Sequence, residues 1–295
     1  MKKENQKTTS AGKPFASIDW TRDDNGFLSA NLTKWTPHFQ KELAPWVKLY
    51  KQINRFGHSI LRTQVSHVMT PRVLAWALYL RVLTSYQAAL FLAERGLDAE
   101  CKTILRSLAE AAFSISAIDK DEQFASKLLK ANDYEDLQWM KKWNELNRGQ
   151  DERLQNKINL LSNSVSKRDK LSVRQIAEAA DMLNVYYAQY SGLCMHGHPT
   201  PHSAARRLRR NTETNSIATH LLPMADDAND NLRLGMMFML FGLKAVFNIF
   251  QFPGAERVLE LHDRFTELCA TLQIFDLRTS QMMSEGRLFI QTNEQ

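Results

Sequence analysis

The chain has 295 residues, of which 44% are hydrophobic and 24% charged, and its formal net charge is +6. This composition is that of an ordinary globular protein and excludes a chain that is disordered throughout. The mild basic excess favours approach to polyanions without requiring it. We expect one helical domain over residues 31–280, between a disordered tail at 1–30 and a C-terminal tail at 281–295.

Cysteine content and hydrophobic patterning indicate the compartment. Cys101, Cys194 and Cys269 are odd in number and lie far apart in apolar helical patterns, which suits a reducing compartment better than a disulfide framework. The polar N-terminus has no apolar stretch of the kind found in a secretory signal. The most hydrophobic segment, 232–252, is interrupted by Arg233 and Lys244, so we expect a core helix, no membrane span and a cytoplasmic protein.

The first helix should follow the polar N-terminal tail. Thr36 and Pro37 are typical of an N-cap and a first helical residue. An apolar face then continues to Tyr50. Gly57 would break or kink this helix.

The next two helices are the most clearly marked. Thr70 and Pro71 predict a helix start, and Gly96 follows the predicted end. Asp98 is then expected to cap an alanine-rich helix. Because small side chains allow close approach, we place this helix at the centre of the fold.

The middle of the chain is predicted to be helical but more polar. Residues 121–148 carry an apolar stripe that we expect to face inward: Leu128, Leu129, Leu137, Trp139, Met140, Trp143 and Leu146. Residues 151–166 should form a surface helix or hairpin partner. Ser172 and Gln175 then have the spacing of a capping box, followed by short helices at about 173–182 and 184–195.

The last part of the chain predicts a long loop and two helices. Residues 197–227 have little apolar periodicity, and long loops in compact domains are often functional. Helices at about 226–252 and 255–275 are separated by Pro253 and Gly254. No β alternation is evident, so we predict an all-α fold, a bundle-like array of about eight helices.

The strongest candidate for chemistry is a histidine cluster at the start of this loop. His196, His198 and His202 lie within seven residues. Because histidine gives and takes protons near neutral pH, we propose His196 and His198 as a catalytic pair. The structural alternative is that a histidine here contacts the terminal carbonyls of the helix.

The same cluster raises the question of a metal. Its three histidines, with Cys194 or a carboxylate completing the shell, are a conceivable transition-metal site. Pro199 stiffens the segment, and no Asp or Glu lies in it. We therefore predict no metal and no cofactor, and keep a metal-dependent hydrolase using these histidines as a third alternative.

Four arginines follow the histidines directly. A guanidinium group presents a fork of donors that suits phosphate oxygens, so this run is a candidate binding site for a phosphodiester backbone. The alternative is a solvated basic face. The four residues are Arg206, Arg207, Arg209 and Arg210.

Arg106 and Glu110 form a second candidate on the alanine-rich helix. Their i, i+4 spacing puts both side chains on one face. Apolar neighbours indicate that this face is partly buried, and a buried charge needs a partner. The alternatives are an ordinary exposed ion pair, or a carboxylate that reaches and orients a histidine of the cluster.

A resemblance follows from these residues. An Arg-x3-Glu helix, followed some eighty residues later by a tyrosine-rich helix ending in Ser and His, resembles an uncharacterised bacterial family of all-helical proteins that is loosely similar to HEPN domains. On this resemblance Arg106, Glu110, Tyr187, Ser191 and His196 occupy the characteristic positions. Tyr187 and Ser191 thereby join the candidates for substrate binding.

The resemblance implies a homodimer that cleaves RNA without a metal, in phage defence or toxin–antitoxin systems. The Arg-x4–6-His motif of HEPN nucleases occurs at Arg62–His67 and Arg257–His262, but chance alone predicts about this many matches. His196 has no arginine at that spacing. The nuclease role therefore does not carry over intact.

Two hypotheses of function result. In the first, an RNA-directed phosphodiesterase uses His196 and His198 for proton transfer, Glu110 to orient one of them, and the four arginines to hold the backbone. In the second, a non-catalytic interaction or sensor protein, with a protein partner, uses Arg106, Glu110, Tyr187 and His196 as a buried network that holds the helices in register. Exposure of these residues would separate the two.

Overall fold

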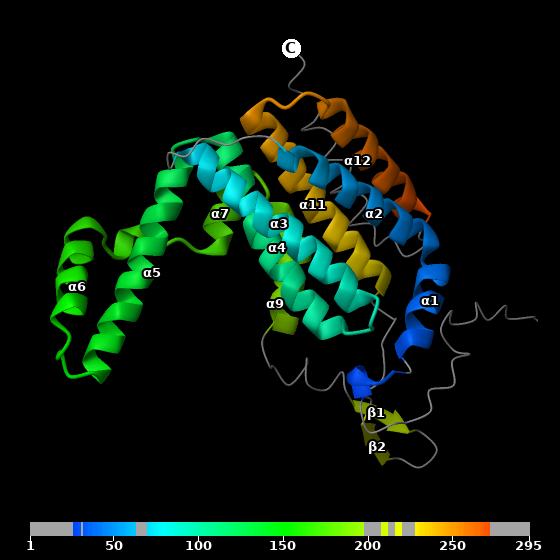
Figure 1. The fold of residues 1–295 in the computed structure, drawn as a ribbon, viewed down its shortest axis with the longest axis horizontal. Helices are drawn as coiled ribbons and strands as arrows, with labels where there is room; N and C mark the ends of the chain where they lie inside the picture. The colour runs from blue at the N-terminus through cyan, green and yellow to red at the C-terminus, as the bar shows by residue number, and fades with distance from the viewer. Residues whose placement is uncertain are drawn as a thin grey trace, which may run out of the picture.

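The computed structural model describes residues 26–30, 32–62, 70–197, 208–211, 216–219 and 228–271. The fold is all-α, as predicted, with one added two-stranded hairpin (Figure 1). It has more helices than the predicted eight, partly because the first predicted helix is divided into two at Leu43 and residues 183–197 are divided into short segments. The described elements are η1 (Gly26–Leu28), α1 (Leu32–Glu42), α2 (Ala44–Ser59), η2 (Ile60–Arg62), α3 (Pro71–Ala93), α4 (Asp98–Lys120), α5 (Phe124–Leu146), α6 (Glu152–Ser164), η3 (Lys167–Asp169), α7 (Val173–Ala179), α8 (Leu183–Val185), a π-helical turn η4 (Tyr186–Tyr190), α9 (Ser191–Gly197), β1 (Leu208–Asn211), β2 (Ser216–Thr219), α11 (Ala228–Phe250) and α12 (Ala255–Ala270).

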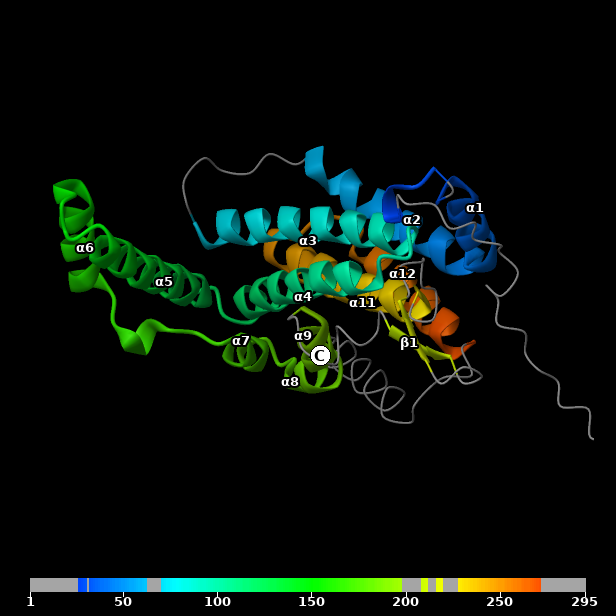
Figure 2. The same cartoon turned by 90° about the horizontal axis from the view of Figure 1, so that it is seen from below.

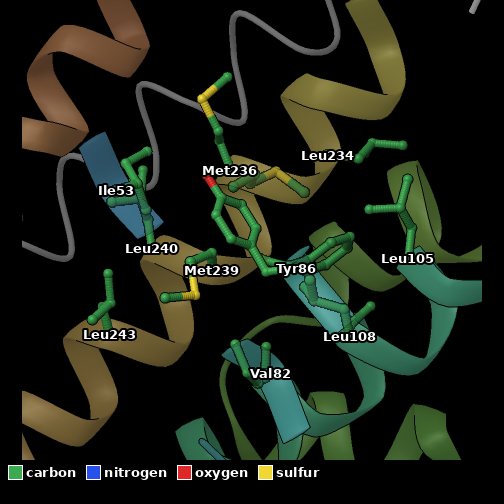
Figure 3. Packing of buried hydrophobic residues seen from close by; sticks show 14 of the residues in the cluster. Ile53, Val82, Tyr86, Leu105, Leu108, Leu234, Met236, Met239, Leu240 and Leu243 are labelled. Carbon is green, nitrogen blue, oxygen red and sulfur yellow. The ribbon is translucent and has the colours of Figure 1, made fainter. Parts of the chain in front are cut away.

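The core of the molecule lies where α3, α4 and α11 pack against one another. Figure 3 shows Tyr86 of α3, Leu105 and Leu108 of α4, and Met236 and Met239 of α11 pointing into a common interior. Helix α4 also contacts α7 and α9, and α11 contacts α2 and α12. The alanine-rich helix is therefore central, as its small side chains predicted.

The ends of α3 confirm the local sequence signals. Thr70 accepts a hydrogen bond from the backbone N–H of Val73 at 3.3 Å, and Pro71 is the first helical residue. Gly96 lies in the turn after the helix with φ +68°, which glycine adopts at little cost. Since each of these effects depends on residues close in the chain, the sequence sufficed to predict them.

Asp98 does not cap α4, contrary to the prediction. The N-cap residue is Leu97, and Asp98 lies buried in the first turn. Its carboxylate accepts a hydrogen bond from the Asn231 amide at 2.7 Å and lies 3.3 Å from the Lys102 ammonium. A buried carboxylate needs such partners, and Asp98 thereby ties α4 to α11.

The first helix also begins earlier than predicted. Helix α1 starts at Leu32, so that Thr36 and Pro37 lie inside it. The hydroxyl of Thr36 donates to the Glu94 carbonyl at 3.3 Å. The break comes at Leu43, and Pro45 lies in the first turn of α2, where a missing N–H costs little.

Gly57 does not break the helix, so that part of the prediction is wrong. It lies inside α2, which continues to Ser59. A Cβ atom at this position would lie 2.5 Å from Met239 Cε and 2.9 Å from the Tyr79 hydroxyl. The glycine is therefore required for close packing of α2 on α3 and α11.

Helices α5 and α6 form an arm that projects from the rest of the molecule (Figures 1 and 2). Helix α6 begins at the Asp151 N-cap and packs on α5 as the predicted hairpin partner. A small separate core joins them. The predicted inward stripe is wrong in part, because Trp139, Trp143, Leu146 and Leu129 are exposed.

The remaining predictions concern the C-terminal half. The capping box of Ser172 and Gln175 is present at the start of α7. Strands β1 and β2 pair antiparallel, with Arg209 opposite Ala218 and Arg210 opposite Ile217, within the segment predicted as a loop. Gly254, with φ +91°, precedes α12.

Two described helices are long and apolar enough to cross a membrane by length and composition alone. These are Pro71–Ala93 and Ala228–Phe250, whose most apolar windows are 39% and 72% buried inside the molecule. The second contains the segment predicted as a core helix and packs in the interior. The predicted absence of a membrane span and the cytoplasmic location stay predictions.

Candidate functional site

Three side chains from two distant segments meet in one hydrogen-bonded triangle. The Nε of Arg106 donates to Glu110 Oε1 at 2.9 Å and lies 3.3 Å from the Tyr190 hydroxyl oxygen. The Tyr190 hydroxyl donates to the same Glu110 oxygen at 2.6 Å. Arg106 and Glu110 are one turn apart on α4, as predicted, whereas Tyr190 comes from the π-helical turn before α9.

Tyr190 is positioned by aromatic packing and by the π-helical turn. Its ring meets Phe113 of α4 edge-on at 5.9 Å and stacks on Tyr186 at 5.1 Å. The Ser191 hydroxyl donates to the Tyr186 carbonyl at 3.1 Å, across five residues. Short π-helical turns inside helices are frequent at functional sites, and this one directs a phenol toward α4.

A second polar contact ties the same segment to α11. The guanidinium of Arg233 on α11 donates to Gln189 Oε1 at 2.8 Å and to Asp230 Oδ1 at 2.6 Å. Gln189 directly precedes Tyr190 in the chain. The tyrosine-rich segment is therefore held by α4 and α11 together.

The electrostatics of the triangle keep two of its groups protonated. Burial raises the pKa of Tyr190, and its hydrogen bonds to Glu110 and Cys194 raise the pKa further. The hydrogen bond with Tyr190 raises the pKa of Arg106, and Glu110 adds to this effect. The triangle thus presents a permanent cation and a phenol that keeps its proton as a donor.

The triangle has a buried side and an open side. Tyr190 is 2% exposed, whereas the side chains of Arg106 and Glu110 are 28% and 36% exposed. It is therefore neither a fully sealed network nor an ordinary surface ion pair. Solvent therefore reaches Arg106 and Glu110, whereas the buried Tyr190 is hydrogen-bonded to both of them.

The predicted site residues Tyr187, Ser191 and His196 lie in the same segment of the chain as Tyr190. His196 is partly buried in the last turn of α9, which packs against α4. Tyr187 is 54% exposed, with the Arg174 guanidinium 5.9 Å from its ring centre. The Ser191 hydroxyl bonds the backbone. A contact between Glu110 and a histidine stays a prediction.

The arginine run and two histidines of the cluster can be placed only in part. His198, His202, Arg206 and Arg207 lie outside the described residues. The backbone of Arg209 and Arg210 belongs to β1. Whether these residues gather near Arg106 stays a prediction. Over the described ranges, no group of three His, Cys, Asp or Glu side chains could hold a metal ion.

Tyr190 is the site residue that the sequence reasoning missed, although a signal for it existed. Tyr187, the tyrosine predicted from the same segment, is exposed. Tyr186, Tyr190 and Leu193 recur at helical spacing, which places Tyr190 on the apolar face that packs inward. That face is the one that meets α4.

Comparisons with known proteins give one family match. No curated protein and no solved structure matches the chain. One family model matches residues 72–216. This span includes most of α3, the helices from α4 to α9 and the arm, and it contains Arg106, Glu110, Tyr190 and His196. A match to a family of unknown function agrees with the predicted uncharacterised domain, and the likeness to HEPN domains stays a prediction. Residues 72–216 match the model of a family of unknown function, DUF5677.

Proposed function

We propose that the protein binds RNA and cleaves its phosphodiester backbone without a metal, at a site centred on Arg106, Glu110 and His196. The observation that carries this proposal is the half-open triangle, in which Tyr190 holds a guanidinium and a carboxylate at a surface that solvent reaches. Preorganised charges of this kind stabilise developing charge in a transition state.

Arg106 would hold the phosphate. Its orientation is set by the hydrogen bonds of its Nε to Glu110 and Tyr190. Its raised pKa keeps the guanidinium charged. Arginine binds phosphate oxygens through a planar fork of donors, so a fixed orientation selects where the scissile phosphate lies.

His196 and His198 would transfer the protons. The 2′-hydroxyl oxygen attacks phosphorus to form a cyclic phosphate, and the bond from phosphorus to the 5′-oxygen breaks. One histidine takes the proton of the 2′-hydroxyl, and the other protonates the leaving 5′-oxygen. His196 supports this role because its helix, α9, packs on the helix that carries Arg106.

The arginine run would bind the rest of the RNA backbone. Arg206, Arg207, Arg209 and Arg210 follow the histidines in the chain. Each phosphate contact adds sequence-independent affinity that falls with salt concentration. Such a site suits RNA cleavage in phage defence or in a toxin–antitoxin system, where broad degradation is useful.

The second candidate is a non-catalytic interaction or sensor protein. The burial of Tyr190 favours it, because a buried phenol that joins α4 to the segment before α9 also fixes helix packing. In that case Arg106 and Glu110 would be needed for stability alone. Loss of RNA cleavage in a mutant that still folds would therefore favour the enzyme over the interaction protein.

The test is cleavage of total cellular RNA by the purified full chain in EDTA. We expect His196→Ala to lower the cleavage rate by roughly 100-fold or more, as for loss of a general acid or base. His58→Ala is the matched control, because His58 is an exposed histidine of α2. Circular dichroism and thermal unfolding confirm that both variants fold.

Arg106→Lys tests the phosphate role separately. Lysine keeps the charge but loses the fork, so we expect a higher KM for RNA with little change in the dependence of binding on salt. Arg55→Lys, at an exposed position of α2, is its control. Absence of cleavage by the wild type would reject the enzyme and favour the interaction protein. Full activity of His196→Ala would reject His196 as a catalytic residue.

A further inference from the structure

The projecting arm exposes two tryptophans on one face of α5. The rings of Trp139 and Trp143 stack at 6.0 Å with 7° between their planes, and they are 62% and 48% exposed. Leu146, one turn further along, is 77% exposed. Large apolar side chains gathered on a surface mark a site of macromolecular contact.

This face lies beside the one that packs on α6. Leu137 and Met140 turn toward α6 and pack on Ile158, and the helical period places Trp139 and Trp143 roughly a third of a turn around α5 from them, where both rings are exposed. Only the start of α5 is anchored in the main core, through Phe124 and Ala125. Figures 1 and 2 show the arm projecting from the bundle, so the tryptophan face is open to a second molecule.

The charges beside the tryptophans show which molecule fits. Glu135 and Lys142 are both exposed and lie seven residues apart on α5, so two helical turns place them on the same flank of the tryptophan stripe. A two-fold axis near Trp139 would bring Glu135 of one chain beside Lys142 of a second copy, and the reverse. One helix face thus carries both halves of a self-complementary pattern.

The same charges argue against RNA on this face. Glu135 and Asp136 lie one turn before Trp139 and are exposed, and carboxylates repel the phosphates that would accompany a base stacked on the ring. Lys142 alone does not compensate for both. The pattern favours a protein surface of matching charge.

We propose that two copies of this chain associate through their α5 helices, packed antiparallel, with Trp139 near the two-fold axis and Glu135 paired with Lys142 of the second copy. From Trp139 the helix extends about 10 Å to Leu146 and about 21 Å back to Ala125. The tip of one arm therefore ends before the body of the other begins. A whole tryptophan buries about 150–250 Å². Because Trp139 and Trp143 are 62% and 48% exposed, they and Leu146 supply the centre of the interface but only part of the roughly 800 Å² per partner of a standard one.

The test is the mass of the full chain by sedimentation velocity, without RNA. We expect the wild type to sediment at twice the 34.0 kDa of one chain. Trp139→Ser with Trp143→Ser should raise the dimer Kd by roughly 100-fold, as for loss of interface hot spots. Phe91→Ser is the matched control, because Phe91 is a 65% exposed aromatic residue on α3 of the body.

A charge reversal tests the antiparallel register and does not depend on the tryptophans. Glu135→Lys and Lys142→Glu should each weaken the dimer, and the double variant should restore it, because each pair is then reversed as a whole. Both positions are exposed, so the fold should survive, as circular dichroism would verify. A monomeric wild type, a tryptophan variant that remains dimeric, or failure of the double variant to restore the dimer would overturn the proposal. Loss of RNA binding on tryptophan substitution in a monomeric protein would assign the face to RNA instead.

Discussion

The hydroxyl oxygen of Tyr190 lies 2.6 Å from Glu110 Oε1. This hydrogen bond joins α4 to a segment eighty residues further along the chain and presses the ring of Tyr190 against Phe113. Because Glu110 also accepts from Arg106, one carboxylate oxygen is the acceptor for both donors of the site. The positions of the Arg106 and Glu110 side chains therefore depend on the hydrogen bonds of Tyr190.

Removal of the Tyr190 hydroxyl tests this dependence. Tyr190→Phe keeps the ring that packs on Phe113 but removes a donor to a carboxylate, so we expect a loss of about 1–2 kcal/mol in the free energy of unfolding. Urea denaturation measures it. Tyr187→Phe, at an exposed ring, should change stability by less than about 0.5 kcal/mol. Equal effects of the two substitutions would show that the bond contributes nothing specific.

Gly57 makes a second prediction, about packing. Gly57→Ala would place a Cβ atom 2.5 Å from Met239 Cε and 2.9 Å from the Tyr79 hydroxyl. We expect a destabilisation of about 1–3 kcal/mol from overpacking, despite the better helix propensity of alanine.

Gly192 is the matched control for Gly57. It also lies inside a helix, α9, but an added Cβ would meet nothing within 4 Å. Gly192→Ala should therefore stabilise the protein by about 0.5–1 kcal/mol. Thermal unfolding of both variants compares them, and a stabilising Gly57→Ala would mean that Met239 and Tyr79 move aside at little cost.

Asp119 predicts a pH dependence of stability. Burial raises the pKa of Asp119, although the hydrogen bond from Asn248 and the charges of Lys244 and Lys120 lower it in part. Because the pKa of Asp119 in the folded state exceeds the unfolded value of about 3.9, folding favours the protonated carboxyl. The contribution of that protonated form to stability is fully present below pH values of about 3.9 and is lost as pH rises through the folded pKa. The ionised carboxylate thus destabilises the folded state at neutral pH.

Asp119→Asn removes this ionisation. We expect a higher Tm than the wild type at pH 7 and no such gain at pH values below about 3.9, where the wild-type carboxyl is protonated in both states. Glu122→Gln, at an exposed position near the start of α5, should show no comparable pH-dependent gain. A variant that is less stable than the wild type at pH 7 would show that the contacts of the carboxylate with Asn248 and the lysines outweigh its burial.

The sequence by itself determined the features that depend on residues close in the chain. Thr70 and Pro71 start α3, and Ser172 with Gln175 starts α7, because each cap is a bond between a side chain and a backbone group within one turn. The all-α class followed from helical periodicity, and the i, i+4 spacing brought Arg106 and Glu110 together.

Only the tertiary structure decided which faces are buried and which distant groups meet. An apolar stripe shows that a helix has a face to bury, but not whether a neighbour covers it, so Trp139 and Trp143 are exposed although their spacing predicted the reverse. A glycine is needed at position 57 because Met239 and Tyr79 of other helices pack closely against it. Asp98 is buried where it can accept a hydrogen bond from Asn231 of α11. Tyr190 reaches Glu110 because a π-helical turn and the ring of Phe113 set its direction. These contacts span large distances in the chain, and their geometry exists only once the helices have packed.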